Sequence, residues 1–211
     1  MEKLDLRKQF KHLYLPSAKK VEVVDVPEFK FVLIDGAIEP GQSPGTSPAF
    51  LQAMEALYGI SYTLKFMSKQ RKEGPIDYTV MALEGLWWVE GGQFDITNYK
   101  NWHWTAMIMQ PDHITPEMYQ QALEQLRKKK PNAALDKLRF EAFHEGLCIQ
   151  TMHIGPYAEE MSTIARMDDF AEENGYSMHG KHHEIYLGDS RRADPAKLKT
   201  MLRHPVRKTG E

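Results

Sequence analysis

The sequence predicts an α+β protein built from two similar halves, each with the element order strand, strand, helix, strand, strand. Three observations support this prediction. Residues 21–109 and residues 138–208 repeat that order. The expected strands alternate apolar and polar side chains, and the expected helices carry apolar residues three or four positions apart. Because each half has too few strands to bury both sheet faces, we expect duplicated halves with antiparallel sheets and a ligand cleft between them.

The repeat also suggests how the chain is divided. We expect a single domain over residues 21–208, preceded by an N-terminal arm over residues 1–20. The first repeat ends at about residue 109, a connector helix lies within residues 110–137, and the second repeat begins at about residue 138. A chain of 211 residues is long enough for one large domain.

The elements of the first repeat follow from local residue preferences. Pro27 separates two stretches of strand-forming residues, and the Gly-rich and Pro-rich residues 41–48 mark a loop. Ser47 before Pro48 is typical of a helix start, with an N-cap and a proline at the first position. The expected elements are strands 21–26 and 29–39, a helix 47–66, strands 77–89 and 102–109, and a short additional piece at 94–98.

The connector and the second repeat have equally clear boundaries. Thr115 before Pro116 starts the connector helix, and the basic run Arg127–Lys130 suits the negative end of its dipole. Gly155–Pro156 precedes the second helix, and Asn174–Gly175 ends it. The expected elements are a helix 115–130, a hairpin 138–144 and 147–153, a helix 157–173, a strand 180–189, a short helix from 194, and a strand 201–208.

The composition excludes several classes of protein. With 42% hydrophobic and 27% charged residues, it is that of an ordinary globular protein. A net charge of -2 gives no basis for a nucleic-acid or anionic-membrane partner. There is no apolar run of membrane-spanning length and no signal-peptide core. The single cysteine, Cys148, excludes an internal disulfide and favours a cytoplasmic location; we expect it to be buried and inert.

The stretch Gly180–Asp189 concentrates the candidate chemistry. Alternation along a strand places His182, Glu184 and Tyr186 on one face and His183, Ile185 and Leu187 on the other. The second set suits a packed face, so Glu184 and Tyr186 remain for the wall of a cavity. A carboxylate among aromatic rings can bind a cation, or its raised pKa can make it a base.

Four tryptophans fall within 18 residues: Trp87, Trp88, Trp102 and Trp104. Neighbouring residues on a strand point to opposite sides, so only one of Trp87 and Trp88 can face the cavity. Trp102 and Trp104 share a face. We interpret the group as a stacking wall for a flat heteroaromatic ligand, while core packing is the alternative for each ring.

The element order and two motifs resemble the GyrI-like small-molecule-binding family of the SOUL superfamily. The motifs are His153–Tyr157 before the second helix and His183–Leu187 followed by Gly188–Asp189. The resemblance covers about residues 20–208. Family members carry an E-x-Y strand that ends in a D-P-like turn, whereas here Asp194–Pro195 stands further along the chain.

The resemblance implies several functions. The family includes gyrase-inhibitory proteins, drug-sensing domains joined to helix-turn-helix regulators, and stand-alone hydrolases that open the cyclopropane of DNA-alkylating cyclopropanoid antibiotics. Too few residues precede residue 20 for a helix-turn-helix, so the chain resembles the stand-alone kind. Its Trp-rich first half resembles the hydrolase subgroup, and the carboxylate of the family's E-x-Y strand maps onto Glu184.

On this basis Glu184 and Tyr186 are the candidate catalytic residues. Glu184 would take a proton from water, and Tyr186 and Tyr157 would hydrogen-bond a ligand carbonyl or that water. The alternatives are an exposed strand carboxylate for Glu184 and a structural tyrosine for Tyr157. Glu84 occupies in the first repeat the place of Glu184 in the second, so it is either another ligand-binding carboxylate or a solvated one.

His182 is expected to lie near the cleft and to tune Glu184; it would also be the axial candidate if a haem-like ligand bound. We predict no metal site, because His182 and His183 point to opposite sides and no carboxylate or cysteine completes a tetrahedral set. No cofactor is predicted.

Two kinds of function therefore fit the sequence. The first is a hydrolase in which water activated by Glu184 opens a cyclopropane. The second is a protein without catalytic activity that sequesters a cationic lipophilic drug through Glu184 and the tryptophans, or that inhibits gyrase. The expected partner is a planar aromatic or cationic small molecule, with no direct nucleic-acid or membrane contact.

Overall fold

The computed structural model describes residues 3–91, 95–96, 98–188 and 193–210. The strands are β1 Glu22–Val26, β2 Phe29–Ala37, β3 Leu83–Val89, β4 Trp102–Gln110, β5 Arg139–Phe143, β6 Gly146–Ile154, β7 Tyr176–Met178, β8 His182–Tyr186 and β9 Lys199–Lys208. The helices are α1 Leu6–Gln9, α2 Lys11–Tyr14, α3 Pro48–Lys69, α4 Pro116–Lys129 and α5 Met161–Glu173, with 3-10 turns η1 Ala133–Lys137, η2 Tyr157–Glu159 and η3 Pro195–Lys197.

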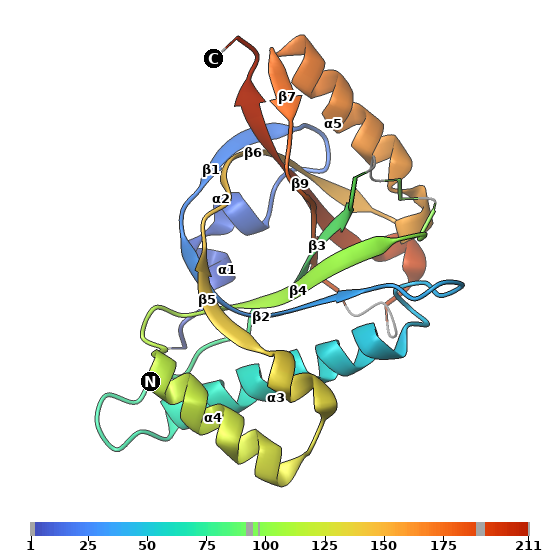
Figure 1. The fold of residues 1–211 in the computed structure, drawn as a ribbon. Coiled ribbons are helices and arrows are strands. Elements are labelled where there is room, and N and C mark those ends of the chain that lie inside the picture. The colour runs from blue at the N-terminus through green and yellow to red at the C-terminus, as the bar shows by residue number, and fades with distance from the viewer. Residues whose placement is uncertain (1–2, 92–94, 97, 189–192, 211) are drawn as a thin grey trace.

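The strands form one sheet in the order β1-β6-β9-β8-β3-β4-β2-β5, and β7 pairs with the end of β9. Every paired strand in it runs antiparallel to its neighbours, which confirms the predicted fold class. The two repeats share this sheet, because β3 of the first pairs with β8 of the second. Figure 1 shows the sheet curving around α1 and α2, with α3 and α5 on its outer side.

Helix starts agree with the cap signals in the sequence. The Ser47 hydroxyl accepts a hydrogen bond from the Phe50 amide, and the Thr115 hydroxyl accepts one from the Met118 amide. Other boundaries differ from the prediction. Residues 77–82 are not strand, because the backbone at Asp77 and Thr79 instead bonds to Leu4 of the N-terminal arm. The predicted second helix divides into η2 and α5, and β7 was not predicted.

The predicted piece at 94–98 and the turn after Gly188 fall partly or wholly outside the described residues. The arm contributes Leu6, Leu13 and Tyr14 to the core.

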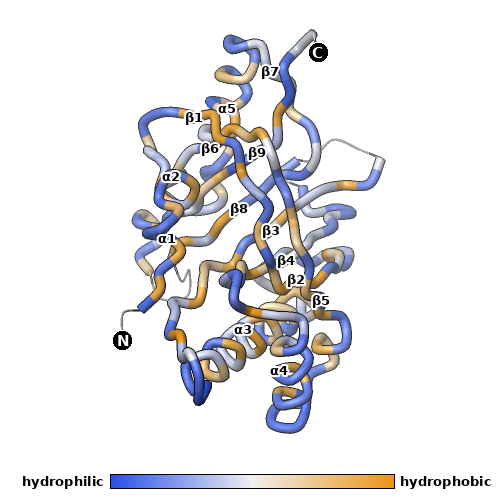
Figure 2. The backbone as a smooth tube through the Cα atoms, turned by 90° about the vertical axis from the view of Figure 1, so that its left-hand side faces the viewer, coloured by the Kyte–Doolittle hydropathy of each residue, from blue (hydrophilic) through white to orange (hydrophobic). Residues whose placement is uncertain are grey.

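The core has two parts. The larger lies on both faces of the sheet, against α3 and α4 on one side and the N-terminal helices on the other. The smaller joins Met167 and Ala171 of α5 to Ile149 and Leu202 of the sheet. Figure 2 shows hydrophobic segments following the strands and hydrophilic ones in the loops at the ends of α3 and α4. None of the helices in the described ranges is long and apolar enough to cross a membrane.

Gly36 on β2 is needed for the packing of Trp104. The two residues are direct partners across β2 and β4, and a Cβ on Gly36 would lie 2.1 Å from the indole ring. We expect Gly36→Ala to lower the free energy of unfolding by about 1–3 kcal/mol, because a packed core must shift to accept the methyl group. Urea unfolding measures this. Gly45→Ala is the control, since nothing lies within 4 Å of its Cβ position; equal losses in both variants would contradict the argument.

Candidate functional site

The strand β8 brings the predicted catalytic residues to one face of the sheet. His182 and Glu184 lie directly opposite Trp87 and Gly85 of β3, and all four side-chain positions share that face. Tyr186 follows Glu184 on the same face. We call this the Glu184 face. The helices α3 and α5 both pack on it, α3 over the first repeat and α5 over the second, as Figure 1 shows. The seam between β3 and β8 therefore lies between the two helices.

A second carboxylate reaches Glu184 from the start of α5. The break at Gly155 and the turn η2 place Glu160 at the N-cap of this helix, where its side chain is fully buried. One ligand atom each from Glu160, His182 and Glu184 lie within 4.8 Å of one another. The His182 Nε2 and Glu184 Oε1 atoms are 3.3 Å apart.

The environment of Glu160 favours its neutral form. Burial and the adjacent Glu184 carboxylate raise the pKa of Glu160 to about 9. Thr200 of β9 favours the ionised form, but its hydroxyl and the Glu160 carboxylate do not meet in a hydrogen bond of normal geometry. Neither Glu160 carboxylate oxygen has a hydrogen-bond partner among the described residues. Glu160 is not among the site residues predicted from the sequence.

Tyr186 stands beside the carboxylates with its hydroxyl fixed. The phenol oxygen accepts a hydrogen bond from Trp87 Nε1 at 3.0 Å. Burial and the nearby Glu184 raise the pKa of Tyr186 well above its usual value, so the group stays protonated and can donate a hydrogen bond. Gly85 provides the space, since a Cβ there would lie 2.7 Å from Trp87 Nε1 and 3.2 Å from the Tyr186 oxygen. The ring of Tyr157 meets Tyr186 edge-on at 5.9 Å.

Three of the four tryptophans, Trp87, Trp102 and Trp104, lie on the Glu184 face, in β3 and β4. Trp87 contacts Trp102 at 5.3 Å between ring centroids, and Phe50 of α3 packs on Trp87 and Trp104 at 5.3 and 5.0 Å. The three indoles are at most 2% exposed. They are therefore a packed aromatic layer, which Trp87 joins to the Tyr186 hydroxyl by its hydrogen bond. The structure places two surface hollows of about 210 and 400 Å³ elsewhere, so a ligand cleft above Glu184 stays a prediction.

Glu84 and Trp88 do not belong to this group. In the register of β3 and β8, Glu84 pairs with Ile185, so its side chain lies on the opposite face from Glu184. Glu84 is not solvated either, because it is fully buried and accepts a hydrogen bond from the Tyr14 hydroxyl at 3.0 Å. Trp88 also points away from Glu184; it stacks on His103, with the Lys181 ammonium 3.4 Å from its ring centroid.

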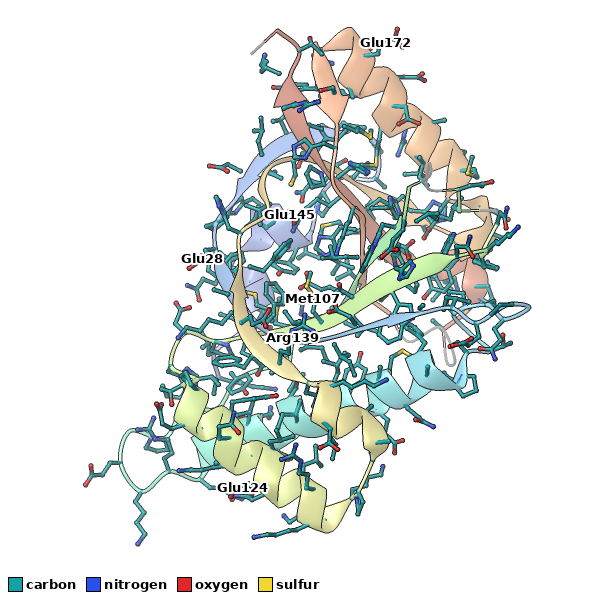
Figure 3. All side chains as sticks on the ribbon, viewed as in Figure 1. Glu28, Met107, Glu124, Arg139, Glu145 and Glu172 are labelled. Atoms are coloured by element: carbon teal, nitrogen blue, oxygen red, sulfur yellow. The ribbon has the colours of Figure 1, made fainter. Side chains whose placement is uncertain are left out.

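The opposite face holds a buried ionic network where the sequence predicted only packing. His183 bridges Glu84 and Glu145 at 3.1 and 2.9 Å, and Arg203 binds the other Glu145 oxygen at 3.0 Å. Figure 3 shows Glu145 at the β5–β6 turn, on the side of the sheet where α1 and α2 lie. Burial opposes every charge here. The charge pairs and hydrogen bonds outweigh the effect of burial. They raise the pKa of His183 to about 9 and lower the pKa of Glu145 to about 2.

These pKa values predict how stability depends on pH. The pKa of Glu145 is depressed, so its contribution is present above its usual value of 4.5 and is lost as the pH falls towards 2. The pKa of His183 is raised, so its contribution is complete below 6.5 and is lost as the pH rises through 9. We expect the unfolding free energy, measured by urea titration, to be highest between pH 4.5 and 6.5 and to decline on both sides of this range. A Glu145→Gln variant should lose part of the acid-side decline; the same decline in both proteins would contradict this assignment.

Comparison with known proteins adds to this geometry. The sequence profile described as the GyrI-like small molecule binding domain matches residues 19–207. A conserved protein from Listeria innocua is 41% identical, with a TM-score of 0.87 over 97% of this chain and 100% of its own. A hydrolase from Listeria innocua is 38% identical, with a TM-score of 0.82 over the same shares.

More distant structures share only the fold. The EcmrR C-terminal domain is 13% identical, with a TM-score of 0.54 over 90% of this chain and 98% of that domain. No curated protein sequence matches this chain.

Proposed function

Because this chain belongs to the family of GyrI-like small-molecule-binding domains, we propose that it is a hydrolase that opens the cyclopropane ring of cyclopropanoid DNA-alkylating compounds. One observation carries the proposal: the buried Glu184 carboxylate and the protonated Tyr186 hydroxyl stand side by side on one face of the sheet. A base and a hydrogen-bond donor in contact with each other are what water addition to a strained, carbonyl-conjugated ring requires.

The reaction would proceed in one concerted step. Glu184 takes a proton from water as the water oxygen bonds to the unsubstituted cyclopropane carbon. The ring carbon–carbon bond breaks, and its electron pair moves through the conjugated system to the carbonyl oxygen, which accepts a proton from Tyr186. The proton on Glu184 then returns to the tyrosine, so the net change is the addition of one water. General base catalysis of this kind contributes about 10²–10⁴-fold.

The aromatic layer would give the substrate its orientation. Trp87 fixes the Tyr186 hydroxyl, and Tyr157, with 37% of its surface exposed, offers an accessible ring at the edge of the same group. A flat substrate would stack there with its carbonyl towards Tyr186. The hydrolase from Listeria innocua, similar over nearly the whole chain, supports hydrolysis as the type of reaction.

Binding without catalysis is the second candidate. Two buried carboxylates next to aromatic rings are also an environment for a lipophilic cation, which Glu184 would neutralise and the rings would contact. In this case the ligand would be retained unchanged.

Turnover separates the two candidates. The purified protein is incubated with an excess of a cyclopropanoid alkylator, and the products are followed by mass spectrometry. We expect many equivalents of a product heavier by one water. Protection limited to one equivalent of intact compound per chain would refute the hydrolase and favour the binding protein.

A further inference from the structure

We infer that Glu160, His182 and Glu184 form a binding site for a transition-metal dication of the Zn²⁺ type. The three residues come from the start of α5 and from β8, and each offers one ligand atom, with these atoms all within 4.8 Å of one another. Exposed fractions of 0%, 5% and 6% show that the site is sheltered from solvent.

The spacing of the donors suits such an ion. Zinc ligands lie about 2.0–2.2 Å from the metal at tetrahedral angles, so two of them stand about 3.3–3.5 Å apart. The separation of 3.3 Å between His182 Nε2 and Glu184 Oε1 has this value. The Glu160 ligand atom lies within 4.8 Å of both, so a small closing of the group would complete a three-ligand set.

Glu160 supplies the second, independent observation. Its carboxylate is fully buried, and among the described residues neither of its oxygens has a hydrogen-bond partner. A buried polar group without a partner is costly, and two neighbouring carboxylates repel each other when both are ionised. A dication between them would satisfy both oxygens and remove the repulsion.

The donor types restrict the metal. One imidazole and two carboxylates favour zinc, cobalt, manganese or iron, because calcium and magnesium take oxygen ligands. Three protein ligands leave a fourth position for water or a substrate oxygen, which is the pattern of catalytic zinc sites. A bound metal would lower the pKa of that water, and Glu184 would then act as a ligand to the metal in place of its role as the base. This catalytic consequence rests on the proposed hydrolase function, whereas the binding itself does not.

The test is metal binding by the untagged, full-length protein after treatment with EDTA and removal of the chelator. Titration calorimetry with ZnCl₂ should show one site per chain, and CoCl₂ should give the visible absorption of a four-coordinate cobalt centre. Glu160→Gln and His182→Gln should each weaken zinc binding by about 100-fold or more, since even residues behind a ligand are worth 10–100-fold. Glu159→Gln, an exposed neighbour of Glu160, is the matched control and should bind like the parent.

Circular dichroism and melting temperature are measured for every variant, so that loss of binding is read only from folded protein. Absence of stoichiometric zinc binding by the parent, or equal binding by Glu160→Gln, would overturn the inference. Turnover measured with and without EDTA separates this inference from the proposed function. Zinc binding without hydrolysis would refute only the function, and hydrolysis without zinc binding would refute only the metal site.

Discussion

Replacement of Glu184 by glutamine is expected to reduce the turnover number for a cyclopropanoid substrate by about 10²–10⁴-fold. Glutamine keeps the size of the side chain but cannot accept the proton of water. Substrate affinity should change little, because stacking on the aromatic rings remains. The turnover number comes from mass spectrometry of the hydrated product, and the affinity from quenching of tryptophan fluorescence under single-turnover conditions.

Glu159→Gln serves as the control here as well, since it removes an exposed carboxylate close to the same helix start. A variant of Glu184 that loses affinity while keeping its turnover number would assign the carboxylate the role of a counter-charge. A variant with unchanged turnover would exclude Glu184 as the base.

The largest expected effect on stability comes from Arg203. This side chain is 1% exposed and binds Glu145 and Gln150 within the ionic network. Arg203→Met should lower the free energy of unfolding by about 3–5 kcal/mol, because the buried Glu145 carboxylate loses one of its two cationic partners and Gln150 loses its hydrogen-bond donor. Urea unfolding at neutral pH measures the difference.

A double variant tests the cause. If the loss of this ion pair is responsible, Arg203→Met combined with Glu145→Gln should be less destabilised than the sum of the single variants. Strict additivity would show that lost packing, and not lost pairing, explains the effect. Arg207→Met, on the exposed end of the same strand, should change stability by less than about 0.5 kcal/mol.

Much of the fold could be predicted because its signals are local. The cap pairs Ser47–Pro48 and Thr115–Pro116 depend only on adjacent residues, and both start helices where expected. The alternation that puts His182, Glu184 and Tyr186 on one face is likewise a property of a single strand, and the register with β3 agrees with it.

What could not be predicted depends on contacts between distant segments. Gly85 of β3 pairs with Glu184, and Glu84 does not. The residues of β3 alone could not predict this register, because it is decided by packing across the whole sheet. An acidic residue in the first turn of a helix usually serves the helix dipole at the surface. Glu160 has that position in the sequence, and only the approach of α5 to β8 shows that it turns inward. Its place after the Gly155–Pro156 break was the available signal.

The pairing of strands across the repeats has a consequence for the autonomy of each repeat. β1 pairs with β6, β2 with β5, and β3 with β8. Every strand of the first repeat except β4 is therefore hydrogen-bonded to a strand of the second repeat. A fragment ending in the connector would leave β1 unpaired and both edges of the β3-β4-β2 sheet exposed, and would therefore be prone to aggregate. The strand pairing therefore makes the two predicted repeats one folding unit.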